Sequence, residues 1–148
     1  MIQIGKYLVK TDVYYDPETH FWVDPSKGTA IIGMSPLVQE TSGSFVAVQI
    51  NKSGSELVEG EAFGTIEAEK HVGPLKAPLS GTIVTINENV VENPRLINDD
   101  PYGEGWLMEI TLADEKSLSN LIHGEDNIKN WFEEELKKYD EKGWIAQP

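Results

Sequence analysis

The sequence predicts a mainly β fold with flanking helices, and three observations support this. Short β-rich segments, separated by Gly, Pro and Asn/Asp turn signals, occupy most of residues 1–112. Glycines at positions 54, 60, 64 and 81 separate several brief apolar segments, which is typical of a compact barrel or a flattened sandwich. Beyond residue 112 the apolar residues recur at helical spacing instead.

Segments rich in β-branched and aromatic residues predict the strands of this core. In chain order they are Tyr7–Val13, Phe21–Val23, Thr29–Ile32, Phe45–Ile50, Leu57-Val58, Ala62-Phe63, Thr65-Ile66, Thr82–Ile86 and Trp106–Leu112. The second and third are expected to pair as a hairpin whose loop is residues 24–28. In the last strand Trp106, Met108, Ile110 and Leu112 alternate and therefore share one face.

Two stretches between these strands are expected not to be extended. Ser35 as the N-cap and Pro36 at the first helical position predict a short helix that ends near Thr41. Residues 93–105 are so rich in Pro, Gly, Asn and Asp that we expect no regular structure there. Within them, Asp100-Pro101-Tyr102-Gly103 fits a type I turn.

The C-terminal part of the chain predicts helices. Leu118, Leu121 and Ile122 recur at helical spacing, and a longer amphipathic helix is expected between Gly124 and Gly143. Its apolar stripe consists of Ile128, Trp131, Phe132, Leu136 and Tyr139. Such a stripe could bind a partner, but we expect it to pack on the chain's own β core. We predict one domain over residues 1–148, with a core over about 20–112 and a helical extension over about 113–142.

Charge and cysteine content exclude several classes of function. Twelve Lys and Arg against 25 Asp and Glu give a net charge of −13, which repels nucleic acid and anionic membranes. The acidity favours docking into a basic cleft on a partner, or it serves only solubility. The absence of cysteine excludes disulfides, thiolate metal sites and a thiol nucleophile, so any sulfur chemistry needs a bound group.

Motifs for a metal site, a membrane span or catalysis are absent from the sequence. His20, His71 and His123 do not have the spacing of metal ligands, so we expect no metal. No apolar run approaches the ~18 residues of a membrane span, and no signal peptide precedes the first strand, so we expect a cytoplasmic protein. Phosphate-binding glycine loops and Gly-x-Ser-x-Gly elbows are also missing, so we expect no catalytic residue and no enzyme.

One segment stands out as a candidate for modification. Lys70 lies six residues after Gly64 and eleven before Gly81, between two predicted strands, so we expect it at an exposed hairpin tip. A modifying enzyme can reach such a lysine, and acylation would turn its side chain into a long neutral tether. The alternative is an ordinary solvated lysine. Lys76 competes as the target, but we expect it inside the returning strand.

Several short motifs around this segment match one protein family. They are Glu67-Ala68-Glu69-Lys70, Pro78-Leu79-Ser80-Gly81, Asn93-Pro94, Leu96-Ile97-Asn98, Asp100-Pro101-Tyr102-Gly103, Gly105-Trp106-Leu107 and, upstream, His20-Phe21-Trp22. In this pattern the chain resembles the H protein of the glycine cleavage system and related lipoate carriers. The resemblance covers about residues 7–140 and is strongest from Gly54 to Leu112.

The resemblance implies a barrel-sandwich hybrid core of the lipoyl/biotinyl type with C-terminal helices. It implies a non-catalytic carrier in which lipoate is bound covalently to Lys70, flanked by Glu67, Glu69 and His71. A ligase or transferase would attach the lipoate, and the carrier would then serve the enzymes of glycine cleavage. The matching residues within 93–105 are expected to act as scaffold.

Departures from the family pattern leave alternatives open. His71 stands where the family has a small residue, Glu69 replaces an apolar residue, and residues 73–74 and 33–37 also differ. One alternative is an H-like lipoate-binding protein that serves sulfur oxidation with a heterodisulfide-reductase-like complex. Another is an unmodified interaction module. A biotin carrier would have methionines beside the lysine, and a phosphopantetheine carrier would need a serine at a helix start in a helical bundle.

Overall fold

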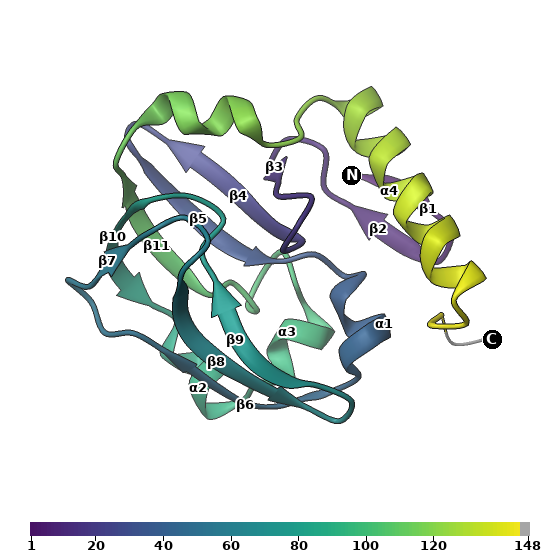
Figure 1. Ribbon diagram of the computed structural model, residues 1–148, viewed down its shortest axis with the longest axis horizontal. Coiled ribbons are helices and arrows are strands. Elements are labelled where there is room, and N and C mark those ends of the chain that lie inside the picture. Colours follow the sequence, from purple (N-terminus) through teal and green to yellow (C-terminus); the bar gives the residue numbers. More distant parts are fainter. Residues whose placement is uncertain (146–148) are drawn as a thin grey trace.

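Three antiparallel sheets make up the β part of the fold, as the computed structural model of residues 1–145 shows (Figure 1). The largest sheet has the order β3 (Tyr14–Tyr15), β4 (Phe21–Ser26), β5 (Thr29–Met34), β11 (Met108–Leu112), β10 (Gly81–Ile86) and β7 (Glu56–Leu57). The second sheet is β6 (Phe45–Ile50), β8 (Ala62–Ala68) and β9 (Val72–Lys76). The third is the hairpin of β1 (Ile2–Ile4) and β2 (Tyr7–Val9).

Helices connect and flank these sheets. They are α1 (Val38–Ser42), α2 (Glu88–Glu92), α3 (Leu96–Asp99), the 3₁₀ helix η1 (Glu115–Asn120) and α4 (Glu125–Glu141). Within residues 1–145, no helix is both long and apolar enough to cross a membrane.

The main core lies between the two larger sheets. Ile32 and Ile110 of the six-stranded sheet and Phe63 and Ile66 of the three-stranded sheet are buried in one apolar cluster. The rings of Phe21 and Phe63 meet across it, with centroids 5.8 Å apart. Burial of apolar surface is the largest favourable term in folding, so this cluster holds the two sheets together. The predicted mainly β fold with flanking helices is confirmed.

A second apolar cluster joins α4 to the N-terminal hairpin. Ile128 and Phe132 of α4 are fully buried, and the ring of Phe132 meets that of Tyr7 edge-on at 5.8 Å. Figure 1 shows α4 running beside β1 and β2. The prediction that the apolar stripe packs on the chain itself is confirmed. The hairpin strand β1 was not predicted.

The β4–β5 hairpin is longer than the sequence predicts. Its strands pair as far as Ser26 and Thr29, so the turn is only Lys27-Gly28. Both turn residues have positive φ, 48° and 85°, which matches the twist that a two-residue hairpin turn requires. The predicted loop over residues 24–28 is therefore wrong for residues 24–26.

Other predicted boundaries also need correction. The strand expected over Tyr7–Val13 ends at Val9, and a separate strand begins at Tyr14. Ser35 does not cap a helix at Pro36, because α1 begins at Val38 and its N-cap residue makes no side-chain bond. The Ser35 hydroxyl instead lies 3.2 Å from Nδ1 of His20.

The segment expected to be irregular contains one helical turn. Residues 93–105 include α3, and the preceding α2 was not predicted either. The expected turn at Asp100 does form, since the amide of Gly103 donates to the carbonyl of Asp100 at 3.1 Å. Of the three residues expected at helical spacing near Leu118, only Leu118 itself lies in a helix, η1.

Candidate functional site

Lys70 lies at the tip of the β8–β9 hairpin. The strands pair up to Glu67 and Val72, and the amide of Ala68 donates to the carbonyl of His71 at 2.7 Å. Glu69, Lys70 and His71 follow outside both strands, and all three are exposed. The structure thus brings the four predicted site residues together at one hairpin end, with Lys70 at its turn.

The hairpin tip does not project freely, because it binds the corner between α1 and β6. The amide of Lys70 donates to the carbonyl of Ser42 at 2.9 Å, and that of Glu69 donates to the carbonyl of Ser44 at 3.1 Å. In return the amide of Ser44 donates to Oε1 of Glu69 at 2.8 Å. This hydrogen bonding from Ser44 holds the pKa of the Glu69 carboxyl below its ordinary value.

The corner that receives the tip has its own support. Gly43 has a φ of 74°, which a residue with a side chain rarely adopts. Its carbonyl accepts a hydrogen bond of 3.2 Å from Nδ2 of Asn98, and Oδ1 of Asn98 accepts one of 3.0 Å from the amide of Phe45. Asn98 therefore braces this corner from α3. From the sequence this residue is expected only to act as scaffold, with no partner identified.

The predicted flanking residues occupy different surroundings. Glu67 pairs with Ala47 on one side and Val72 on the other, and all three residues are exposed on the outer face of the sheet. Glu69 binds the Ser44 amide, as described above. Lys76 ends β9, within the returning strand where the sequence predicts it, and is exposed.

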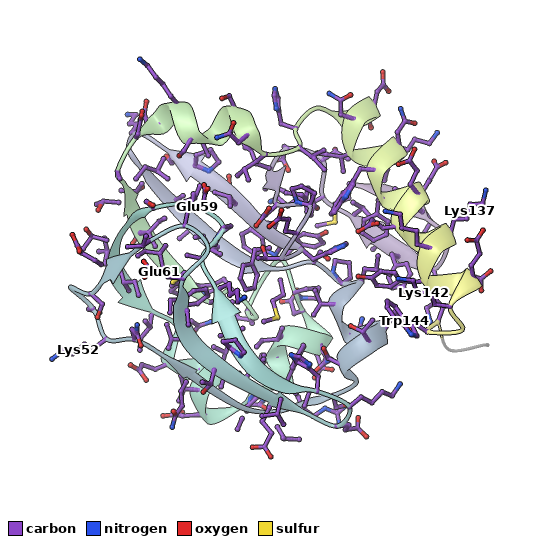
Figure 2. The ribbon with its side chains drawn as sticks, in the orientation of Figure 1. Lys52, Glu59, Glu61, Lys137, Lys142 and Trp144 are labelled. Atoms are coloured by element: carbon purple, nitrogen blue, oxygen red, sulfur yellow. The ribbon has the colours of Figure 1, made fainter. Side chains whose placement is uncertain are left out.

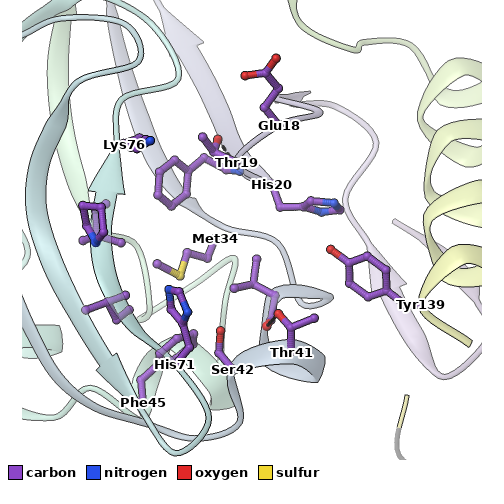
Figure 3. A pocket seen from close by; sticks show the side chains of 15 residues that line it. Glu18, Thr19, His20, Met34, Thr41, Ser42, Phe45, His71, Lys76 and Tyr139 are labelled. Atoms are coloured by element: carbon purple, nitrogen blue, oxygen red, sulfur yellow. Dashed lines mark hydrogen bonds between the residues drawn. The ribbon is translucent and has the colours of Figure 1, made fainter. Parts of the chain in front are cut away.

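A cleft of about 310 Å³ opens beside the hairpin (Figure 3). His71 and Lys76 line it from the hairpin, and Met34 and Phe45 line it from the body of the fold. Tyr139 of α4 lies across the cleft from the hairpin. The sequence does not predict this cleft, because its walls come from segments that are distant in the chain.

His20, which also lines the cleft, forms a buried polar link to α4. Its Nε2 lies 2.8 Å from Oε1 of Glu135 on α4. Burial lowers the pKa of His20, although the bond to Glu135 opposes this effect. Within residues 1–145, no group of three or more His, Asp or Glu side chains is placed to hold a metal ion.

The chain is similar to one family of known proteins. Residues 13–135 match the family model described as glycine cleavage H-protein. The glycine cleavage system H protein of Carboxydothermus hydrogenoformans is 36% identical over 127 residues, covering 86% of this chain and 97% of that protein. Glycine cleavage system H protein 4 of Aquifex aeolicus is 38% identical over 138 residues, covering 91% and 80%.

A solved structure supports the same relationship. The glycine cleavage system H protein of Mycobacterium marinum superposes with a TM-score of 0.66 at 33% identity, covering 71% of this chain and 87% of that chain. This similarity confirms the predicted barrel-sandwich hybrid core with C-terminal helices. The matched family residues 13–135 leave out β1, β2 and the last turns of α4.

Proposed function

Since this chain belongs to the glycine cleavage H-protein family, we propose that it is a non-catalytic lipoyl carrier whose Lys70 holds the lipoyl group. The main support for this proposal is the position of Lys70 at the exposed turn of a hairpin. An attaching enzyme can reach an amine there without unfolding the core. Lys76, the other lysine of the hairpin, instead lies at the far end of β9 and faces the cleft.

The chemistry of attachment fits a solvent-exposed lysine. The Nζ amine, once deprotonated, would attack an activated carboxyl carbon of lipoate, form an amide and expel the activating group. The product loses the positive charge of the lysine. Bound lipoate would supply a disulfide that can be reduced or can accept a transferred group. The chain has no cysteine of its own, so no protein thiol competes with that disulfide.

The surroundings of Lys70 suggest how partners are recognised. Glu67 adds an exposed carboxylate close to the tip of a chain whose net charge is −13. Opposite charge on a partner accelerates encounter and fixes orientation. We therefore infer that the lipoate ligase or transferase, and the glycine cleavage enzymes served later, dock with basic surfaces. We further propose that residues 1–148 act as one domain in the cytoplasm. The sulfur-oxidation alternative stays a prediction, because none of the similar proteins named above bears on it.

The proposal is tested by intact mass measurement of the chain purified from its native host. The parent and Lys76→Arg should both show the mass of one lipoyl group. Lys70→Arg should lack it, because a guanidinium keeps the charge but is a poor acyl acceptor. Circular dichroism should show that both variants fold. A lipoyl mass on Lys70→Arg, or its loss only in Lys76→Arg, would refute the assignment, and a biotinyl or unmodified parent would refute the cargo.

A further inference from the structure

Three hydrogen bonds attach the hairpin tip to the α1–β6 corner, and we refer to them as the tip clasp. Two join backbone groups, Lys70 N to Ser42 O and Glu69 N to Ser44 O. The third joins Oε1 of Glu69 to the Ser44 amide at 2.8 Å. Among the described contacts, Glu69 is thus the only residue of the tip whose side chain takes part in the clasp.

The clasp geometry depends on close packing at Gly43. A Cβ added to Gly43 would lie 3.2 Å from both Cβ and Oε1 of Glu69, so the carboxylate side chain lies directly against this corner. A hydrogen bond from an amide to an ionised carboxylate is shorter and stronger than one to a neutral acceptor. The bonds from Ser44, and after them the charges of Lys70 and Arg95, lower the pKa of Glu69, so this acceptor stays ionised to a lower pH than an ordinary Glu carboxyl.

We propose that Glu69 is a positioning residue for Lys70, which holds the hairpin tip in the single backbone conformation that the lipoate-attaching enzyme recognises. This inference rests on the proposed function of Lys70. When only a fraction of molecules has the competent conformation, the apparent affinity falls by that fraction. A fixed tip therefore lowers the concentration of carrier that the attaching enzyme needs, while the acylation step itself is unaffected.

The experiment uses unmodified full-length chain in two measurements. The first follows hydrogen exchange of the Ser44 and Lys70 amides by NMR, which reports the clasp without any enzyme. The second measures kcat and KM for the chain as substrate of a lipoate ligase supplied with lipoate and ATP. The variants are Glu69→Ala, which removes the acceptor, and Glu69→Gln, which keeps an acceptor oxygen but loses the charge. Glu61→Ala, an exposed carboxylate ahead of β8 on the same hairpin, is the matched control.

In Glu69→Ala both amides should exchange faster, and KM should rise about two- to tenfold with kcat unchanged, the range expected for the loss of one net hydrogen bond. Glu69→Gln should restore most of the parent KM, and Glu61→Ala should match the parent. Unchanged exchange or unchanged KM in Glu69→Ala would overturn the positioning role while leaving the lipoyl assignment intact. A parent chain that is never lipoylated would overturn the proposed function and this role with it, even with the clasp visible in the exchange data.

Discussion

His20 and Glu135 form a buried hydrogen bond of 2.8 Å between the turn before β4 and the middle of α4. The imidazole is held on both nitrogens, because Nδ1 lies 3.2 Å from the Ser35 hydroxyl. Its ring also packs against Trp131, with centroids 4.8 Å apart. His20 has a φ of 64°, a backbone conformation that residues other than glycine rarely adopt. One imidazole therefore joins α4 to the sheet.

Acid should weaken the fold through His20. Burial lowers its pKa, Glu135 and Asp16 partly oppose this shift, and Lys138 adds to it. As the pH falls, His20 is therefore protonated first in the unfolded chain, near its ordinary pKa of about 6.5. The contribution of His20 to the free energy of unfolding is complete above that pH. Below it the contribution declines by up to about 1.4 kcal/mol per pH unit.

Urea unfolding between pH 7 and pH 5 measures this effect. The free energy of unfolding should fall more steeply with acid in the parent than in His20→Asn, since asparagine tolerates a positive φ but does not titrate. His71→Asn, which makes the same substitution at an exposed imidazole, is the matched control. Equal slopes in the parent and His20→Asn would contradict the prediction.

Truncation of Phe132 should destabilise the whole chain. The side chain is fully buried between α4 and the N-terminal hairpin. Phe132→Ala should cost about 3–5 kcal/mol of unfolding free energy, the usual loss for a buried Phe. Chemical denaturation followed by circular dichroism measures it, with the exposed neighbour Glu133→Ala as the control. A small change in stability together with lost partner binding would show that α4 is a docking element instead.

The ring of Trp22 leaves no room for a side chain at Gly33. A Cβ on Gly33 would lie 2.3 Å from the ring, which cannot easily shift because its Nε1 donates to the carbonyl of Pro101 at 3.0 Å. Gly33→Ala should therefore cost about 1–3 kcal/mol, as is typical of overpacking. Thermal denaturation of Gly33→Ala, Trp22→Leu and the double variant tests the cause. The double variant should lose less stability than the sum of the losses in the two single variants, because a smaller side chain at position 22 removes the clash. Simple additivity of the losses would refute the clash as the cause.

The sequence predicted most strands but misplaced ends that depend on neighbouring strands. Pro25 suggested a loop because proline cannot donate to a ladder. In the structure β3 pairs only with Trp22 and Val23, so beyond Val23 the outer edge of β4 needs no donor. Proline is tolerated at that edge, and β4 continues to Ser26. Which edge a strand presents is a tertiary property that local composition does not show.

In the candidate site, too, the sequence predicts local features but not contacts between distant segments. The glycine spacing around Lys70 predicted a hairpin tip, because turns and strands are local features. The tip clasp was not predictable, since it joins Glu69 to Ser44 across a separation of 25 residues. The sequence does not predict the turn α3, because part of its support is also distant: the side chain of Asn98 bonds Gly43 and Phe45, more than 50 residues earlier in the chain.

His71 lies where it can contact a group carried on Lys70. It directly follows Lys70, lines the cleft, and its ring lies over Gly73, with Nε2 3.0 Å from the position of an added Cβ. An imidazole has two ring nitrogens that can donate or accept a hydrogen bond, so His71 could position the cargo or exchange protons with it. The alternative is that His71 is an exposed turn residue without a role.

Replacing His71 with alanine separates these two readings. Folding and the extent of lipoylation should stay close to the parent, because the attaching enzyme needs an accessible lysine and the tip clasp does not involve the imidazole. Turnover of the lipoylated chain with the glycine cleavage enzymes should fall about two- to tenfold, the effect expected for one lost polar contact. His123→Ala, which removes an exposed histidine outside the residues that line the cleft, should match the parent throughout. If His71→Ala also matches the parent, the imidazole has no part in the reaction, and its place beside Lys70 is incidental.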